Sequence, residues 1–302
     1  MSITVKLEVA SIQPASSRTM KLSKLTTLVG LVILFSTIAF GQSPTYIKRT
    51  THKQDRLDFG VGGSLSVIGA PNGSIRIEGW SNREVEITAE IEIQAANAQD
   101  LDRISKVTGF VLEESLGRIG VISAGTHDKK YLKKADKKFP KTLLGLPFKV
   151  DYLIKVPRYC DLEIDGGAGD LTVSGVEGTM KINFLETAAK IDLIGGGITA
   201  TIGTGSLDLT IPSRSWRGHF ADVQVANGTM NVWLPTGLNA DFDANILRTG
   251  SIENGFTGFV PKTRKTEFTE KSIAAKSGAG TIPVKFTVGD GTLKITEIGK
   301  PS

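Results

Sequence analysis

Residues 168–175 read Ala-Gly-Asp-Leu-Thr-Val-Ser-Gly, and residues 188–195 follow the same pattern as Ala-Ala-Lys-Ile-Asp-Leu-Ile-Gly. In both stretches small residues precede two apolar residues that are separated by one polar residue. Apolar residues at every second position are typical of a β-strand with one buried and one exposed side. The unit recurs along the chain, with starts at Gly63, Gly73, Gly169, Ala189, Gly205, Gly228, Gly250 and Gly291.

From Gly169 to Gly250 the starts are 20, 16, 23 and 22 residues apart, and Gly291 follows after 41. A length near 20 residues is too long for one strand with its turn and too short for a strand-helix-strand unit. It suits one coil of a β-solenoid, in which stacked coils pair their backbones and the inward apolar residues form one core. The sequence therefore predicts an all-β fold, with a β-solenoid of roughly 20-residue coils over residues 149–302. A β-sandwich of short strands would show the same alternation and is the alternative.

The prediction names six inward-facing residues in the middle of the chain: Leu171, Val173, Ile191, Leu193, Leu207 and Leu209. The N-terminal β region, residues 42–148, is expected to be continuous with the coils. One short helix is predicted there, from Asn97 to Val107. Asn97 is suited to cap it, and Leu101, Ile104 and Val107 form an apolar stripe.

Residues 1–41 are predicted to be a leader that contains a signal peptide. An apolar run over residues 25–40 follows two lysines and ends in small residues, which predicts cleavage after Gly41. The run is shorter than the roughly 20 apolar residues that a membrane-spanning helix needs, so the mature chain is not expected to be an integral membrane protein. Met20 would give a basic region of ordinary length, so translation is expected to start there rather than at Met1. The expected location is the periplasm, the cell surface or the extracellular space.

The residue types that usually carry chemistry are sparse. Cys160 is the only cysteine, which excludes an intramolecular disulfide, and its surroundings favour a buried strand residue. The three histidines lie far apart, and no zinc-ligand spacing occurs. No nucleophile elbow is present, and the glycine clusters lack the lysine of a phosphate loop. We expect no cofactor and no catalytic residue.

One pair of acidic residues is a candidate metal site. Asp192 and Asp208 each lie between the two apolar residues of their unit. If the units stack in register, the two carboxylates lie about 5 Å apart. Carboxylates at that distance are able to bind a cation such as Ca²⁺.

A lysine-rich loop, residues 126–141, is the strongest charge feature. It contains Lys129, Lys130, Lys133, Lys134, Lys137, Lys138 and Lys141 against two aspartates. Such a loop predicts a binding surface for anionic lipid headgroups or acidic polysaccharide. Nucleic acid is not expected as a partner, because the protein is predicted to be exported and the loop lacks arginine.

Three stretches resemble a known family. They are Gly-Ser-Ile-Arg-Ile-Glu-Gly-Trp at 73–80, Tyr-Leu-Ile-Lys-Val-Pro at 152–157 with the unit at 169–175, and Gly-Thr-Leu-Lys-Ile at 291–295. They are similar to the "putative adhesin" family of secreted bacterial proteins over most of residues 60–297. The resemblance implies a right-handed β-solenoid at the cell envelope and brings no catalytic residues. The lysine-rich loop departs from that family.

The sequence therefore predicts an exported, non-enzymatic, adhesin-like protein of the cell envelope or surface that binds through a solenoid face and a basic loop. The alternative is a carbohydrate-active enzyme, a polysaccharide lyase or hydrolase on a β-helix scaffold. That enzyme would need three or more carboxylates that converge near an arginine or lysine in a groove.

Overall fold

The computed structural model describes residues 46–299 apart from residues 61, 214 and 215, and all of these belong to one unit. The unit is all-β, as predicted. The predicted leader and its cleavage site lie outside the described residues. Within the described ranges, no helix has the length and apolar character needed to cross a membrane.

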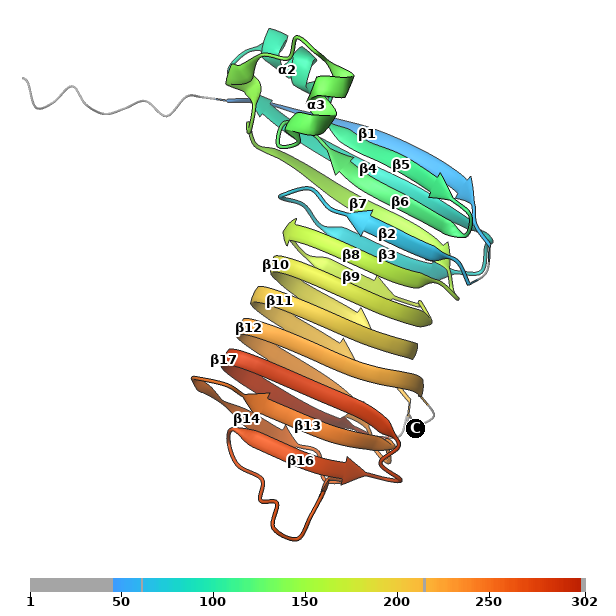
Figure 1. Ribbon diagram of the computed structural model, residues 1–302, viewed down its shortest axis with the longest axis vertical. Helices are drawn as coiled ribbons and strands as arrows, with labels where there is room; N and C mark the ends of the chain where they lie inside the picture. Colours follow the sequence, from blue (N-terminus) through green and yellow to red (C-terminus); the bar gives the residue numbers. More distant parts are fainter. Residues whose placement is uncertain (1–45, 61, 214–215, 300–302) are drawn as a thin grey trace, which may run out of the picture. The chain divides into compact units, whose positions relative to one another are not determined.

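The N-terminal part consists of short and medium strands with two helices (Figure 1). Its elements are β1 (Ile47–Asp58), β2 (Ser64–Ile68), β3 (Ile75–Trp80), β4 (Glu84–Ala95), α2 (Ala98–Ser105), β5 (Gly109–Ser115), β6 (Arg118–Ala124), α3 (Lys129–Ala135), the 3-10 turn η1 (Lys141–Leu143), β7 (Phe148–Pro157), β8 (Asp161–Ala168) and β9 (Leu171–Ser174).

The C-terminal part is dominated by four long strands. These are β10 (Gly178–Asp192), β11 (Gly195–Thr210), β12 (Arg217–Pro235) and β17 (Ile282–Ile298). Four shorter strands lie between β12 and β17 in the sequence: β13 (Ala240–Ile246), β14 (Gly250–Gly255), β15 (Val260–Pro261) and β16 (Ser272–Ser277).

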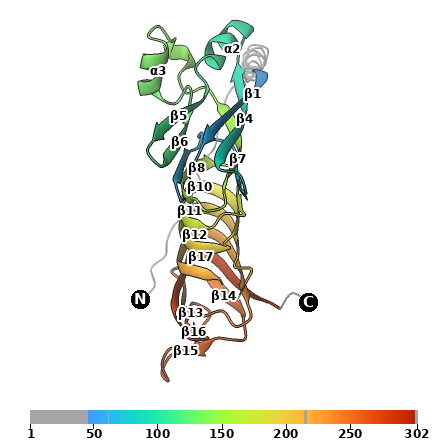
Figure 2. The ribbon, with the colours of Figure 1, turned by 90° about the vertical axis from the view of Figure 1, so that its right-hand side faces the viewer.

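Each long strand contributes one half to each of two layers. The first half of β10 pairs with β8 and its second half pairs with β9, in both cases in parallel. β11, β12 and β17 continue both ladders in parallel (Figures 1 and 2). We call the layer that contains β8 face 1 and the layer that contains β9 face 2.

The two faces carry different strands at their ends. Face 1 runs in the order β5, β6, β2, β8, the first halves of β10, β11, β12 and β17, then β13, β16 and β15. Face 2 runs in the order β1, β4, β7, β3, β9, the second halves of the same long strands, then β14. The pairs β1–β4, β4–β7, β5–β6, β13–β16 and β15–β16 are antiparallel.

The core consists of columns of apolar side chains that follow the register. One column contains Ile75, Leu171, Ala189, Leu207, Met230, Leu293 and Ile252, which are paired one after another across neighbouring strands. All seven are buried. The six residues that the sequence predicted to face inward are each at most 1% exposed, so that prediction is confirmed. Burial of this many apolar side chains supplies the main driving force for folding.

The two ends of the core are covered differently. At one end, α2 packs against β4, and the amide of Asp100 donates to the Asn97 side chain at 2.9 Å, which confirms the predicted cap. At the other end, the segment after β14 folds Phe256 and Phe259 onto Phe242, with ring centroids of successive pairs 4.5 Å apart. Both caps keep apolar side chains at the ends of the stack away from water.

Chain order and spatial order differ at the C-terminal end. β17 comes last in the sequence, yet it lies between β12 on one side and β13 and β14 on the other (Figure 1). Gly291 of β17 is therefore paired with both Gly228 and Gly250. Gly250 and Gly291 are 41 residues apart in the sequence, but their strands, β14 and β17, are direct neighbours in the sheet.

Candidate ligand-binding surface

The lysine-rich segment is an ordered element with a helix in it. α3 begins after Asp128, whose carboxylate accepts hydrogen bonds from the amides of Lys130 and Tyr131 at 2.8 and 2.9 Å. Asp136, after the helix, accepts from the amide of Lys138 at 2.9 Å. Both acidic side chains of the segment are thus directed to backbone N–H groups.

Apolar residues attach this segment to the rest of the unit. Leu132 and Leu143 are 3% and 4% exposed, and Leu143 belongs to the main core. The hydroxyl of Thr126 donates to the Leu146 carbonyl at 2.6 Å, and the His127 ring stacks on Phe148 with centroids 5.1 Å apart. The segment predicted as a loop therefore contains the helix α3, and its apolar side packs on the unit. A helical stripe places Leu132 inward and lysines outward.

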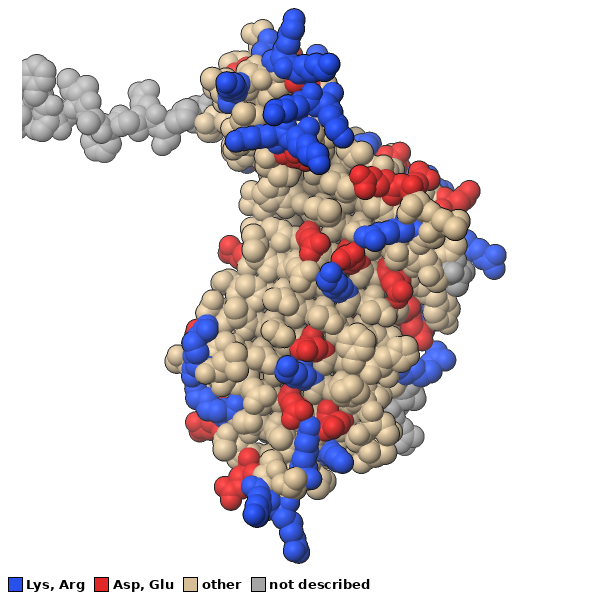
Figure 3. Space-filling model, viewed as in Figure 1, with Lys and Arg blue, Asp and Glu red and all other residues tan. Residues whose placement is uncertain are grey.

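All seven predicted lysines are exposed: Lys129, Lys130, Lys133, Lys134, Lys137, Lys138 and Lys141. None of them lies within 4.0 Å of a carboxylate oxygen of the described residues, although eight other lysines of the chain do. Figure 3 shows basic side chains gathered over this end of the unit. Since no neighbouring acid neutralises them, the segment carries a concentrated positive charge.

A groove runs along the outer side of β5 and β6 beside α3. Its part next to the helix has a volume of about 630 Å³, and Lys130 and Lys134 line it together with Tyr131, Val111 and Ile122. A second hollow of about 490 Å³ continues it, and the two share Glu113 and Ile122. We call the two hollows together the β5–β6 groove.

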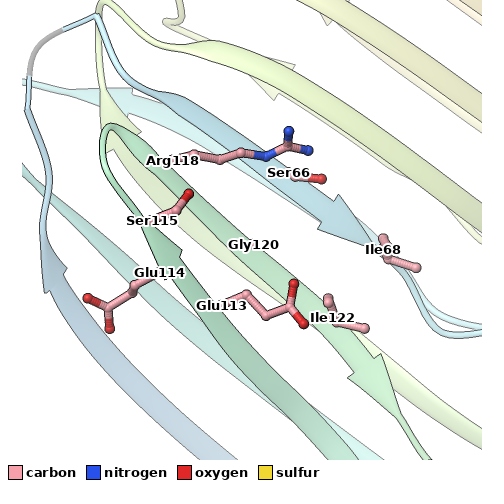
Figure 4. Close-up of a pocket in the computed structure, with 8 residues that line it drawn as sticks. All are labelled: Ser66, Ile68, Glu113, Glu114, Ser115, Arg118, Gly120 and Ile122. Atoms are coloured by element: carbon pink, nitrogen blue, oxygen red, sulfur yellow. The ribbon is translucent and has the colours of Figure 1, made fainter. Parts of the chain in front are cut away.

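The far end of the β5–β6 groove is polar (Figure 4). Gly120 lies in the middle of β6 and leaves the floor without a side chain, while Arg118 and Ser66 lie beside it. The guanidinium of Arg118 lies 3.0 Å from Glu163. Lys181 and Arg118 both pair with Glu163 and lower the pKa of that carboxyl.

Three acidic residues line the groove, and one of them, Asp128, caps α3. Glu113 and Glu114 are consecutive in β5, so their side chains point to opposite sides of the strand, and Figure 4 shows them directed apart. Among the described residues there is no group of three or more His, Cys, Asp or Glu side chains arranged to hold a metal ion.

The predicted stacking of Asp192 and Asp208 is wrong. The ladder pairs Asp208 with Lys190 and pairs Asp192 with Thr210. On its other side, Asp208 accepts a hydrogen bond from the Asn231 amide at 2.8 Å. The two carboxylates are therefore two register positions apart, and Asp208 has an amide donor where the prediction placed a cation.

The physical reason for this error lies at Thr187. Thr187 is paired with Gly205, so it occupies the position at which the next strand has its glycine. Alignment of the repeats on their small residues starts this repeat at Ala189. The structure places the equivalent position two residues earlier, at Thr187. A shift of two residues keeps every apolar side chain on the inner side, so the alternation alone does not reveal it.

Cys160 is 1% exposed, so its predicted burial is confirmed, but it lies between β7 and β8 and is not itself a strand residue. Burial raises the pKa of its thiol to about 12. The thiolate that a nucleophile or metal ligand requires is therefore disfavoured at neutral pH.

No protein-family model matches the chain, and no curated protein matches it. The chain is similar to the solved structure of a "putative cell adhesion protein" from Clostridium sporogenes, with 14% identity and a TM-score of 0.44 over 82% of this chain and 100% of that one. A "putative adhesin" from Bacteroides fragilis gives 10% identity and a TM-score of 0.33 over 84% and 98%. A "putative lipid binding protein" from Parabacteroides distasonis gives 9% and 0.27 over 80% and 96%.

Proposed function

We propose that this chain is an exported, non-enzymatic, adhesin-like protein of the cell envelope, which binds surfaces that carry closely spaced anionic groups. The observation that carries the proposal is the set of seven exposed lysines without ion pairs on and after α3. The leader in the sequence supports export to the periplasm, the cell surface or the medium.

The arrangement of the lysines supports an anionic surface as the ligand. Each lysine close to such a surface contributes about 1 kcal/mol, and the attraction decays within roughly 10 Å at 0.1 M salt. Leu132 and Leu143 hold the segment against the unit, so little backbone conformational entropy is lost when the lysines meet a ligand. Phosphates of lipid headgroups and carboxylates of acidic polysaccharides share this chemistry.

We also propose that the strands from β8 to β17 form the coils of a β-solenoid. The solenoid would be right-handed, as the family resemblance implies. The parallel, in-register pairing of both halves of β10, β11, β12 and β17 supports this. Such a scaffold would present long, rigid faces of outward-pointing polar side chains to a ligand.

The enzyme alternative has less support. Glu163 is ion-paired with Arg118 and Lys181, Asp128 caps α3, and Glu113 and Glu114 point apart. The acidic residues in and beside the β5–β6 groove therefore give little support for the acid pair that glycoside hydrolysis uses.

The test uses the variant in which Lys130, Lys133, Lys134 and Lys137 are replaced by glutamine. We expect the wild type to co-sediment with phosphatidylglycerol vesicles or with dextran sulfate, a polysaccharide without carboxylates, at low salt, and the variant to lose most of this binding. Vesicles of phosphatidylcholine alone serve as the neutral surface. The vesicle and dextran sulfate arms distinguish a lipid from a polysaccharide source of the negative charge.

A matched control replaces four exposed lysines outside the segment, at positions 106, 190, 265 and 276, by glutamine. It removes the same net charge and should bind like the wild type. Equal loss in both variants would show that net charge alone drives binding. Full binding by the first variant would contradict the assigned surface.

A further inference from the structure

A separate hollow lies on face 2, at the ends of strands that are distant in the sequence. It has a volume of about 670 Å³ and is lined by Gly79, Trp80, Asn82, Arg83, Arg158 and Tyr159, among others. β3 is parallel to both β7 and β9, so these three strands end at the same edge of the sheet. The loops that follow them therefore meet there, and we call the hollow the Trp80–Tyr159 pocket.

Two aromatic rings form its apolar part. The Trp80 indole N–H donates to the Glu84 carbonyl at 2.9 Å, and the ammonium of Lys155 lies 5.4 Å from the ring centroid. Tyr159 is 49% exposed, which is high for a large aromatic residue, and the Arg158 guanidinium lies 5.8 Å from its ring centroid. A ring that is held as Trp80 is loses little freedom when a ligand stacks on it.

Backbone without side chains lines another part of the pocket. A Cβ at Gly79 would overlap the carbonyl oxygen of Gly175, and Gly175 itself has φ of 71°. Only glycine fits this close approach of two strands without strain.

The charge of the pocket is positive. Arg83 and Arg158 line it, and no acidic side chain does. Arg83 has no ion pair with a described residue. Arg158 lies 3.6 Å from Glu177, a carboxylate that Arg217 approaches more closely, at 3.2 Å. At least one guanidinium is thus available for a planar anion, which arginine binds through two parallel hydrogen bonds.

We infer that the Trp80–Tyr159 pocket binds an acidic sugar, a pyranose that carries a carboxylate, within a polysaccharide. The C–H side of a pyranose covers an aromatic ring, Asn82 offers an amide to its hydroxyl groups, and Arg83 pairs with the carboxylate. A nucleotide shares the need for rings and positive charge. The choice of a sugar rests on the proposed export of the chain, because polysaccharides are the anionic ring-containing polymers outside the cell.

Isothermal titration of the full exported chain with trigalacturonate tests this inference. We expect wild type to bind it more tightly than neutral maltotriose. Arg83→Gln and Tyr159→Ala should each weaken binding by about tenfold or more, the factor that loss of one charge-assisted or stacking contact gives. Tyr159→Phe, which retains the ring, should remain close to wild type.

The matched control is Arg264→Gln, which removes an exposed arginine far along the chain and should leave the affinity unchanged. The quadruple lysine variant should also keep trigalacturonate binding while it loses binding to phosphatidylglycerol vesicles and dextran sulfate, which carry no sugar carboxylate, so the two proposals fail separately. Tyr159→Leu replaces Tyr159→Ala if the alanine variant melts earlier than wild type. Absence of binding by wild type, unchanged affinity of the Arg83 and Tyr159 variants, or tighter binding of uridine monophosphate would each overturn the inference.

Discussion

Gly228 lies directly against Gly205 of the neighbouring strand, so closely that a Cβ at Gly228 would overlap the Gly205 carbonyl oxygen. The next strand repeats this relationship, because Gly291 stands in the same way against Gly228. Gly228 and Gly205 have φ of 141° and 128°, values that side chains other than glycine rarely adopt. In β11, β12 and β17 the repeated glycine of the sequence is therefore the point where the strand passes from face 1 to face 2.

Gly228→Ala should consequently be among the most destabilising single substitutions. The added methyl group meets backbone on the neighbouring strand, which has no freedom to move, and the positive φ adds strain. We expect a loss of several kcal/mol or failure to fold, measured by thermal melting. Gly60→Ala is the control, because nothing lies within 4 Å of a Cβ there and its φ is not positive. A Gly228→Ala protein that melts like Gly60→Ala would contradict this assignment of the glycine position.

Ile191→Asp should unfold the protein. Ile191 is fully buried and paired with Val173 and Leu209, so the new carboxylate would have only apolar neighbours in its column. An unpaired buried charge costs several kcal/mol, against a total stability of about 5–15 kcal/mol. Thr201→Asp is the control, since Thr201 is exposed and is paired with the uncharged residues Asn183 and Gln224. Circular dichroism should show a cooperative melt for the control alone, and a soluble, cooperatively melting Ile191→Asp protein would show that the register is wrong.

Asp151 should make stability depend on pH in acid. Its burial opposes ionisation, but hydrogen bonds from Lys149 and from the amide and hydroxyl of Ser74 outweigh burial and lower the pKa of its carboxyl below the ordinary 3.8. Because the pKa is lower in the folded state, the carboxylate stabilises the fold fully above pH 3.8, and this contribution is lost as pH falls through the folded-state pKa.

The melting temperatures of wild type and Asp151→Asn measure this effect. The wild type should be more stable at neutral pH, and the difference should shrink as pH falls below 3.8. Asp170→Asn, at an exposed position, is the matched control. A difference that stays constant across this range would mean that the hydrogen bonds of Asp151 do not favour its charged form.

The Cys160 thiol should not react with Ellman's reagent in the folded protein at about pH 8, because only the thiolate reacts and burial raises its pKa to about 12. In denaturant one thiol per chain should react. Rapid reaction without denaturant would show that the strand ends around Cys160 open on the time scale of the assay.

The core and the binding surfaces differ in how far sequence reveals them. Alternation of apolar residues identified the inward face at Leu171, Leu207 and Leu209, because a strand has a period of two wherever it lies. The lysine segment could be recognised in the sequence because its lysines lie close together along the chain. The β5–β6 groove and the Trp80–Tyr159 pocket had no signal of that kind. Trp80 and Tyr159 are 79 positions apart, and only the pairing of β3 with β7 brings them to one edge.

Sequence by itself determined that this protein is all-β, which residues face its core, where α2 begins and where positive charge is concentrated. Each of these depends on neighbours within a few residues, and local sterics and hydrophobicity decide them. Tertiary structure alone decided the order and register of the strands. It placed β17 between β12 and β14, and it paired Asp208 with Lys190 instead of Asp192. Parallel strands that share one alternation can pair at several registers with the same face buried, so the choice depends on close backbone contacts such as that of Gly228 with Gly205.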